Sequence, residues 1–398
     1  MKNKDMAKEN EIKTVVPALR FPEFQDTEGW KEYKLKNLCE IGNGKDYKHL
    51  SSGNIPLYGS GGYMTSVDDF LYDGESVCIG RKGTIDKPIF LTGKFWTVDT
   101  LFYTHSFNNC LPKFLYLIFQ KINWYKYNEA GGIPSLSKTT IGEINVFAPV
   151  GKKGELKEQQ KIADCLSSLD ELIEATTQKV ETLKEHKKGL MQRLFPAEGK
   201  NAPDLRFPEF QGMKEWKKTY IYEECPNPYS GGTPKTTEKK YYGGNIPFIR
   251  SAEIGKDKTE LSITQEGLNN SSAKMIQKGD LLIALYGANS GDMAISKIDG
   301  AINQAILCLK AKSNNLFIYY ALLKKQKDIV SKYLQGGQGN LSGEIIKSID
   351  FYIPQGIEQQ KIADCLSSLD ELIDATSRKV EILKEHKKGL MQQLFPKI

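Results

Sequence analysis

Two segments of the chain repeat mostly apolar residues at alternating spacings of four and three, with Glu, Lys and Asp on the other faces. This heptad spacing is typical of a coiled coil, in which a narrow apolar seam faces a second helix. The predicted seam residues are Ile162, Leu166, Leu169, Ile173, Val180, Leu183 and Leu190 in the first segment, and Ile362, Leu366, Leu369, Ile373, Val380, Leu383 and Leu390 in the second. A proline, Pro196 or Pro396, is expected to end each helix.

The two helical segments are near copies of each other. Residues 158–196 and 358–396 differ at five of 39 positions, and the stretch EQQKIADCLSSLDELI is identical in both. About 37 residues at a rise of ~1.5 Å make a helix of roughly 55 Å. Because the matching seam lies in the same chain, we predict an antiparallel intramolecular pair with an approximate twofold axis near Thr176 and Thr376. The alternative is that each helix packs only on the region that precedes it.

The regions that precede the helices carry shorter hydrophobic runs. SVCIG, PIFLTG, FWTVDTLFYT, DLLIALYG and AILCLKA are bounded by Gly, Asn and Asp, which is typical of strands. One helix is predicted in each region, around residues 112–122 and 316–334. The two regions also share landmarks in the same order, including LRFPEFQ followed closely by Trp30 or Trp216, and GNIP.

The sequence therefore predicts an α+β architecture used twice. The expected parts are a polar tail (1–16), a first globule (17–157), a first long helix (158–196), a second globule (197–357) and a second long helix (358–398).

Net charge is concentrated outside the helices. The whole chain carries +6, whereas each 39-residue helical segment carries −1, so the remaining residues carry +8. An excess of positive charge in the globules favours a polyanion such as nucleic acid as partner. A lysine-rich proteome is the alternative explanation.

The seven cysteines form no CxxC pair and have no histidine nearby. This pattern predicts reduced thiols in a cytoplasmic protein and no metal site. No run approaches the roughly 20 apolar residues of a membrane helix, and the N-terminus lacks the apolar core of a signal peptide. We therefore expect no membrane partner.

Catalytic motifs are missing from the sequence. The nearest approach to the methyltransferase motif [DNS]-P-P-[YF] is Asn227-Pro228-Tyr229, which has one proline instead of two. There is no GxxxxGK[ST] phosphate loop and no glycine loop in a strand–helix context. We expect no catalytic residues in this chain and no cofactor bound by it.

The duplicated helices, together with GGTPKT…YYGGNIPFIRSAEI (231–254) and GANSGDMAI…GAINQAILCLK (287–310), resemble the DNA-specificity subunits of type I restriction-modification systems. This resemblance covers nearly the whole chain. It implies that each globule is a target-recognition domain for one half of a bipartite double-stranded DNA site, with the helices as the spacer. It also implies two modification subunits that carry S-adenosylmethionine and methylate adenine, and two restriction subunits that use ATP and Mg²⁺.

Two other functions are the alternatives to this one. The first is a coiled-coil adaptor with two protein-binding domains. The second is a free-standing DNA methyltransferase or nuclease, against which the missing motifs argue.

Base recognition needs Arg, Lys, Asn, Gln, Ser or Thr on loops that reach the DNA grooves, together with cations for phosphates. The candidates in the loops of the first globule are Lys45, Tyr47, Lys48, Ser60, Arg81, Lys82, Trp96 and Lys138. The candidates in the loops of the second globule are Lys235, Thr237, Arg250, Ser251, Tyr286, Asn289, Ser290, Asn303, Gln304, Gln338 and Asn340. For each of them the alternative is a solvated loop residue or a turn former.

Overall fold

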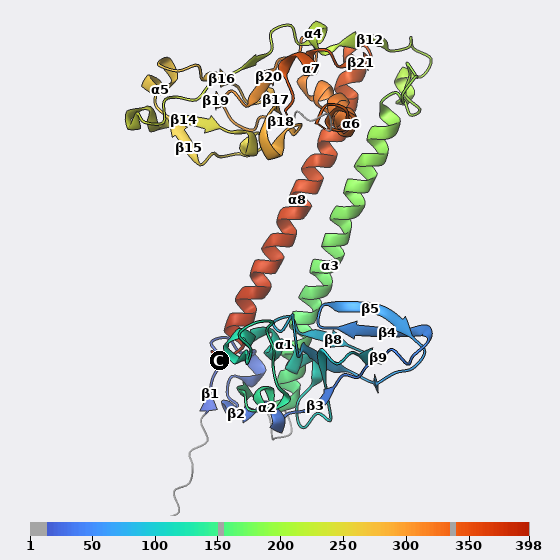
Figure 1. The fold of residues 1–398 in the computed structure, drawn as a ribbon, viewed down its shortest axis with the longest axis vertical. Helices are drawn as coiled ribbons and strands as arrows, with labels where there is room; N and C mark the ends of the chain where they lie inside the picture. Colours follow the sequence, from blue (N-terminus) through green and yellow to red (C-terminus); the bar gives the residue numbers. More distant parts are fainter. Residues whose placement is uncertain (1–13, 150–154, 335–339, 398) are drawn as a thin grey trace, which may run out of the picture. The chain divides into compact units, whose positions relative to one another are not determined.

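The computed structural model describes residues 14–149, 155–334 and 340–397, which form two compact units (Figure 1). The first unit comprises residues 1–176 and 378–398, and the second comprises residues 177–377. The two long helices, α3 (Glu155–Leu194) and α8 (Gly356–Leu394), each contribute one end to each unit. Each unit therefore consists of one globule and two helical segments.

The described part of the first globule contains three sheets and two helices. The sheet next to the long helices has the order β1-β2-β11 (Thr14–Val15, Trp30–Lys34, Asn145–Ala148). The second has the order β3-β10-β7-β8 (Glu40–Asn43, Leu101–His105, Ser76–Gly80, Ile89–Leu91). The third has the order β5-β4-β9-β6 (Gly62–Val67, Ser52–Gly59, Lys94–Thr97, Tyr72–Asp73). The helices are α1 (Pro112–Lys121) and α2 (Lys138–Gly142).

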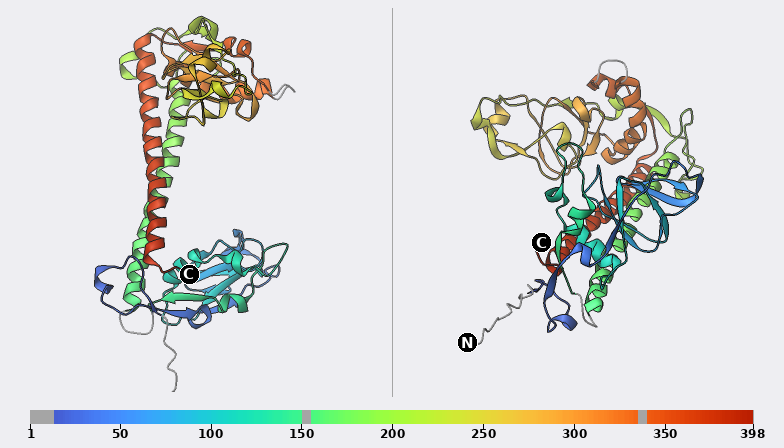
Figure 2. Two further views of the ribbon diagram at one scale, coloured as in Figure 1. Left: turned by 90° about the vertical axis from the view of Figure 1, so that its left-hand side faces the viewer. Right: turned by 60° about the horizontal axis from the view of Figure 1, so that its bottom comes forward.

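The second globule, drawn from two further sides in Figure 2, repeats the strand orders of the first. Its sheets have the orders β12-β21 (Lys217–Tyr220, Asp350–Ile353), β13-β20-β17-β18 (Tyr229–Ser230, Ile306–Leu309, Leu281–Ala284, Met293–Ile295) and β15-β14-β19-β16 (Leu261–Ile263, Tyr242–Ile249, Gly300–Ile302, Lys274–Ile276). Its helices are α4 (Ile221–Glu224), α5 (Gln265–Asn269), α6 (Asn315–Leu334) and α7 (Gly343–Lys347). In both globules one central pair, β4–β9 or β14–β19, is parallel.

The α+β fold class predicted from the sequence is confirmed. The predicted helices correspond to α1 and α6, and SVCIG and AILCLKA contain the central strands β7 and β20. The run FWTVDTLFYT forms two strands, β9 and β10, because a turn closed by the Leu101 N–H and the Val98 carbonyl (2.9 Å) separates them. Trp96, which was chosen as a loop residue, lies in β9.

The long helices pack against each other in opposite directions. In the first unit the Lys387 ammonium lies 2.6 Å from Asp170, and in the second unit Lys187 lies 2.5 Å from Asp370. Both lysines occupy seam positions, where a charge is costly unless it is paired, so each ion pair favours this orientation and register. The alternative, in which each helix packs only on its own globule, is wrong.

All the predicted seam residues are buried or half-buried. Ile162 and Leu166 are at most 1% exposed, and they join the core of the first globule together with Leu394 and Phe395 at the end of α8. Their copies at 362 and 366 join the core of the second globule in the same way. The ends of each helix thus belong to a globular core as well as to the helix pair.

A buried clamp connects each LRFPEFQ motif to the start of a long helix. The Arg20 guanidinium donates two hydrogen bonds of 2.7 Å to the Glu158 carboxylate, and it also donates to the carbonyls of Thr27 and Glu28. The indole N–H of Trp30 donates to the same carboxylate at 3.2 Å.

The second unit has the same arginine–glutamate pair, but the buried indole N–H of Trp216 has no hydrogen-bond partner among the described residues. Arg206 donates two hydrogen bonds of 2.7 Å to Glu358. Glu158 and Glu358 are the first residues of the two EQQKIADCLSSLDELI copies, so the two duplicated motifs contact each other in each unit.

The C-terminal end of each long helix is anchored by a lysine and by aromatic side chains. The Lys121 ammonium donates to the carbonyls of Phe395 and Pro396, and Lys324 donates in the same way to Phe195 and Pro196. A cation at this position satisfies carbonyls that the helix leaves unpaired and complements the helix dipole. In the first unit the Phe395 ring stacks on a phenylalanine of α1, and in the second Phe195 contacts the corresponding ring of α6.

All seven cysteines are free thiols, and five of them are at most 4% exposed. Burial raises the pKa of Cys78 to about 12, and the same effect raises the pKa of Cys225 to about 12. A thiol in this state is a poor nucleophile at neutral pH. We therefore expect iodoacetamide to alkylate only the two half-buried thiols, Cys165 and Cys365, in the native protein. Mass spectrometry that finds a buried thiol labelled before unfolding would contradict this expectation.

Candidate nucleic-acid interface

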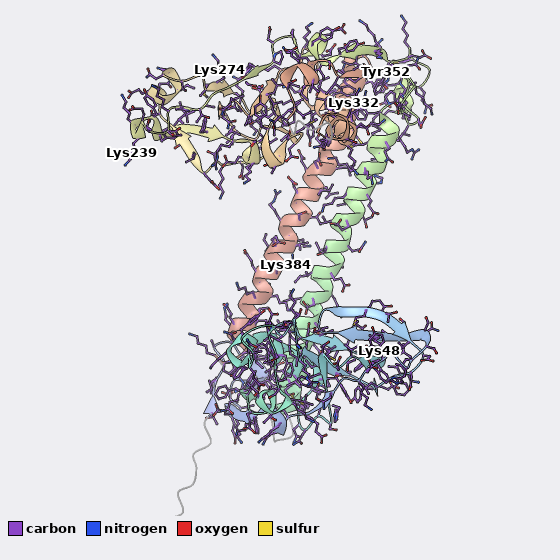
Figure 3. All side chains as sticks on the ribbon, in the orientation of Figure 1. Lys48, Lys239, Lys274, Lys332, Tyr352 and Lys384 are labelled. Atoms are coloured by element: carbon purple, nitrogen blue, oxygen red, sulfur yellow. The ribbon has the colours of Figure 1, made fainter. Side chains whose placement is uncertain are left out.

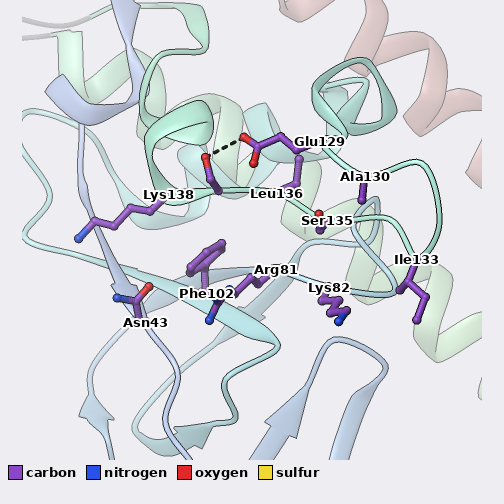
Figure 4. A pocket seen from close by; sticks show the side chains of 11 residues that line it. Asn43, Arg81, Lys82, Phe102, Glu129, Ala130, Ile133, Ser135, Leu136 and Lys138 are labelled. Carbon is purple, nitrogen blue, oxygen red and sulfur yellow. Dashed lines mark hydrogen bonds between the residues drawn. The ribbon is translucent and has the colours of Figure 1, made fainter.

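Three of the candidate cations lie together at one hollow of the first globule (Figure 4). The hollow has a volume of about 840 Å³. It is lined by Asn43, Arg81, Lys82, Phe102, Glu129, Ala130, Ile133, Ser135, Leu136, Ser137 and Lys138. Arg81, Lys82 and Lys138 come from two loops that are more than 50 residues apart in the sequence.

Arg81 and Lys82 are fixed in place by the end of the buried strand β7. The Arg81 N–H donates to the Thr100 carbonyl at 2.8 Å, and its carbonyl accepts from the Leu136 N–H at 2.9 Å. The loop turns sharply at two glycines. A Cβ on Gly80 would lie 1.9 Å from the Thr84 carbonyl oxygen, and Gly83 has a φ of +91°, which other residues rarely adopt. The motif GRKG therefore holds two cations at the end of a rigid strand.

Lys138 is the first residue of α2, which is capped from within the hollow. The Ser137 hydroxyl accepts a hydrogen bond from the Thr140 N–H at 3.1 Å. Glu129 accepts from the hydroxyls of Thr140 and Ser137, and these hydrogen bonds hold the pKa of its carboxyl below the ordinary value. Its carboxylate is thus ionised and engaged by hydroxyl groups, and it forms no ion pair with the three cations.

The three cations are exposed and available to a ligand. The Arg81 guanidinium donates one long hydrogen bond, 3.4 Å, to the Asp99 carbonyl. Among the described residues, neither Arg81 nor the two lysines has an ion-pair partner. Three unpaired cations against one carboxylate give the hollow a net positive charge. Free lysines suit phosphate oxygens, and a free guanidinium also suits the two acceptors of guanine in the major groove.

The other candidates of the first globule are distributed differently. Lys45 and Lys48 are exposed, and Figure 3 labels Lys48 on this globule. Tyr47 is half-buried against the core cluster that contains Trp96. Trp96 itself is 5% exposed, and its indole N–H donates to the Lys45 carbonyl at 3.0 Å, so its side chain packs in the core instead of reaching a groove. Ser60 lies beside the Arg81 loop. Its hydroxyl oxygen would be 3.3 Å from the Cβ atom of a residue that replaced Gly83.

The candidates of the second globule form two groups. Lys235 and Thr237 are exposed on a loop near the strand β14. In this loop the Thr233 hydroxyl donates a hydrogen bond of 2.8 Å to the side-chain oxygen of Gln304. The Asn303 carbonyl accepts from Gly231 in the same region, and its side chain accepts from the Ala305 N–H. These contacts bring two of the predicted loops together.

The other group follows the central strand β17. Tyr286 is 40% exposed. The Asn289 amide donates a hydrogen bond to the Asp292 carboxylate, and the Ser290 hydroxyl donates to the Leu285 carbonyl, so both side chains are engaged within the turn. Asn340 is exposed next to Leu341, whose N–H donates to the Leu285 carbonyl at 2.9 Å. Gln338 lies outside the described residues.

Arg250 is not free to bind a base. Its guanidinium forms ion pairs with Glu253 at 3.1 Å and with Glu260 at 2.5 Å. The hydrogen bonds that the guanidinium donates to these two carboxylates raise the pKa of Arg250 above its ordinary value. The prediction that Arg250 contacts DNA did not take into account the two acidic residues that follow it, and Ser251 lies half-buried in the same turn.

The hydrogen bonds of the two central strands show which residues are equivalent. The Arg81 N–H donates to the Thr100 carbonyl, and the Leu285 N–H donates to the Ala305 carbonyl in the same way. The Arg81 carbonyl accepts from the Leu136 N–H, and the Leu285 carbonyl accepts from the Leu341 N–H. Leu285 therefore occupies the place of Arg81, and Tyr286 that of Lys82. The cations of the first globule have no counterpart at these positions of the second.

Four polar residues of the hollow were not among the candidates chosen from the sequence: Asn43, Glu129, Ser135 and Ser137. The amide of Asn43 and the hydroxyl groups of the two serines were the available signals in the sequence. Nothing in the sequence marked Glu129, because its role depends on the fold. Among the described residues, no group of three or more His, Cys, Asp or Glu side chains is arranged to hold a metal ion. No helix in the described part of the chain is long and apolar enough to cross a membrane.

Comparisons with known proteins point to one family. A family model described as the type I restriction modification DNA specificity domain matches residues 27–185 and again residues 213–385. The MjaVIII type I restriction enzyme specificity subunit of Methanocaldococcus jannaschii is 25% identical over 343 residues, which cover 82% of this chain and 77% of that one. The MjaIX specificity subunit of the same organism is 30% identical over 192 residues, which cover 46% of this chain and 44% of that one.

Solved structures show the same fold. The crystal structure of the type I restriction-modification S subunit from M. genitalium matches with a TM-score of 0.71 and 17% identity, covering 96% of this chain and 100% of that chain. A chain from a study of complex assembly and conformational transition in the type I system matches with a TM-score of 0.53 and 15% identity, covering 93% of this chain and 98% of that chain.

Proposed function

The chain belongs to the type I restriction-modification DNA specificity family, and on this basis we propose that each of its globules binds one half of a bipartite double-stranded DNA target. The cationic hollow at Arg81, Lys82 and Lys138 is the observation that carries this proposal. The two globules share a topology but differ at the equivalent loop positions, as expected for two modules that recognise different half-sites.

The helix pair is the proposed spacer between the half-sites. The 40 residues of α3 correspond to ~60 Å at a rise of ~1.5 Å per residue. This length exceeds one turn of B-DNA, about 34–36 Å. A target with unread base pairs between its two halves fits such a spacer.

The two near-identical helices also support a proposal about protein partners. Equivalent surfaces on α3 and α8 suit two copies of one partner, and we assign these as two modification subunits, together with two restriction subunits. In this proposal S-adenosylmethionine, ATP and Mg²⁺ belong to those subunits, and this chain is a non-catalytic scaffold. Tyr229, in the nearest approach to a methyltransferase motif, lies in strand β13 and donates to the Met275 carbonyl, which supports a structural role. The seven free thiols suit action in the cytoplasm.

Substitution of Arg81 tests the proposal. Arg81→Ala in the full-length chain with its modification subunits should weaken binding of a target duplex by ~1–3 kcal/mol, which is roughly 5- to 150-fold, if the guanidinium contacts a guanine. Fluorescence anisotropy with a labelled duplex measures this loss. Arg81→Lys separates the two kinds of contact, because it keeps the charge for a phosphate but loses the planar fork that matches guanine.

Lys113→Gln serves as the control, because Lys113 is exposed on α1 and does not line the hollow. This variant should bind as the wild type does. The assignment of the hollow is refuted if Arg81→Ala and Lys113→Gln bind equally well. The wider proposal fails if the wild-type complex protects no DNA.

A further inference from the structure

The two globules differ in the length of one connection between two paired strands. In the first globule β4 and β5 are joined by the two residues Ser60 and Gly61. In the second globule the equivalent strands β14 and β15 are joined by residues 250–260, hereafter the 250–260 loop. A loop of eleven residues is costly to order, so a fixed conformation needs specific contacts.

The base of the 250–260 loop is held by a buried carboxylate. Glu253 is 3% exposed and accepts hydrogen bonds from the Arg250 side chain at 3.1 Å and from the Glu260 N–H at 2.9 Å. Burial alone would raise the pKa of Glu253, but these hydrogen bonds outweigh it and the pKa lies below its ordinary value. The ionised Glu253 therefore joins both ends of the loop through Arg250 and Glu260.

The middle of the loop packs against the end of β17. Ile254 is 6% exposed and belongs to a core cluster with Leu282 and Ala284 of that strand. A Cβ on Gly255 would stand 3.2 Å from the Ala294 side chain on the neighbouring strand. Since Ala284 precedes the Leu285–Tyr286 turn directly, the 250–260 loop lies beside the positions that are equivalent to Arg81 and Lys82.

The exposed tip of the loop, residues 256–258, carries one excess positive charge. Lys256 and Lys258 flank Asp257, all three are exposed, and neither lysine has an ion-pair partner among the described residues. In the first globule the corresponding turn also borders the Arg81 loop, through Ser60. The cations that are missing after β17 are thus offered by the neighbouring loop.

We propose that Lys256 and Lys258 bind backbone phosphates of the half-site recognised by the second globule, and that Arg250 and Glu253 are positioning residues that hold the loop for this contact. This inference rests on the proposed function, because it names the DNA contact of one of the two globules. It assigns Arg250 a different role from the base contact that the sequence had suggested.

The salt dependence of DNA binding tests the inference. Each phosphate contact contributes about 0.9 to the slope of log K against log salt concentration. The double variant Lys256→Gln/Lys258→Gln, in the full-length chain with its modification subunits, should therefore lower the slope by about 1.8. A fourfold rise in salt would then weaken wild-type binding about 12-fold more than binding by the variant.

Lys278→Gln/Lys312→Gln is the matched control. Both lysines are exposed, and they lie before β17 and after β20, at the opposite end of the sheet from the loop. The control removes the same charge and should leave the slope unchanged. An equal fall in slope in both double variants would mean that only net charge matters, and would overturn the inference.

The positioning role has its own readout. Glu253→Gln should speed hydrogen exchange in residues 254–260 and weaken DNA binding although both lysines remain. Adding Lys256→Gln and Lys258→Gln to Glu253→Gln should then weaken DNA binding little further, because the same phosphate contact is already lost. If Glu253→Gln fails to fold, Glu260→Gln removes the exposed partner, whose side chain is 76% exposed, and should give the same pattern. If the losses of DNA-binding free energy caused by the glutamate and the lysine substitutions add in full, the positioning role is overturned.

The outcomes separate this inference from the proposed function. If the wild-type complex binds no DNA, the proposed function is wrong. If the wild type binds and Lys256→Gln/Lys258→Gln keeps the full slope, the phosphate contact alone is wrong. A variant that loses its modification subunits but keeps the slope would identify the loop as a protein contact, which also contradicts the inference.

Discussion

Glu158→Ala should lower the free energy of unfolding of the first unit by about 3–5 kcal/mol, because it leaves a buried guanidinium without its carboxylate. The side chains of Arg20 and Glu158 are 5% and 2% exposed. Arg20 would keep its hydrogen bonds to two carbonyls but lose both bonds to Glu158, and the Trp30 indole would lose its acceptor as well. The effect can be measured by hydrogen exchange of the amides in β2 and β12, which have different sequences and report on the two units separately.

The chain supplies its own controls for this experiment. Glu358→Ala removes the equivalent carboxylate and should destabilise the second unit while β2 keeps its protection. Glu23→Ala removes a solvent-exposed ion pair with Lys161 from the same motif and should leave the stability of the first unit nearly unchanged. A loss below 1 kcal/mol for Glu158→Ala, or an equal response of β2 and β12, would mean that the clamp does not stabilise the first unit.

The clamps explain why LRFPEFQ is duplicated together with the long helices. The arginine of each motif contacts the first glutamate of a helix repeat, and the neighbouring Leu19 and Leu205 N–H groups donate to carbonyls near the end of the other helix. These residues are tied to one another by direct contact in each unit. The loops that we propose to bind DNA are not held by these contacts, so their sequences can differ between the two globules.

The periodic parts of the fold were predictable from the sequence. The heptad spacing identified both long helices, and β-branched runs between glycines identified central strands such as β7 and β20. The division of FWTVDTLFYT into β9 and β10 was missed because a turn at Asp99 and Thr100 carries no glycine or proline. The parallel pairing of β4 with β9 could not be predicted from local sequence patterns, because the two strands are distant in the sequence.

The candidate interface was only partly predictable, because loops were judged one at a time. Arg81 and Lys138 were each selected for chemistry, but only the fold brings them to one hollow. Arg250 was selected for the same reason, although Glu253 and Glu260 neutralise it. Residue type thus identified cations well, whereas their availability depended on neighbours that only the structure reveals.

Removal of one heptad from each long helix should abolish binding to the native target. Deleting residues 174–180 and 374–380 keeps the spacing of the seam. Both deletions lie between the helix positions that carry the Asp170 and Lys187 ion pairs, so these pairs can still form. Each helix becomes ~10.5 Å shorter, which corresponds to about three base pairs at 3.4 Å per base pair.

The loss should be large because DNA is a helix. Three base pairs turn the second half-site by roughly 105° around the DNA axis, given 10–10.5 base pairs per turn. Removal of one heptad rotates the rest of an α-helix by only ~20° about the helix axis. The two globules therefore cannot both reach their half-sites, and loss of simultaneous binding should weaken affinity for the native target by about 10²–10⁴-fold.

Exchange of residues 174–180 with residues 374–380 is the matched control, since it alters the same positions without changing their number. This variant should bind as the wild type does. Selection of targets by the shortened protein from randomised duplexes provides the decisive measurement. Both half-site sequences should be retained in any selected target, because the globules are intact, while the number of base pairs between them changes. Retention of the native spacing at wild-type affinity would show that the helices do not set the distance between half-sites.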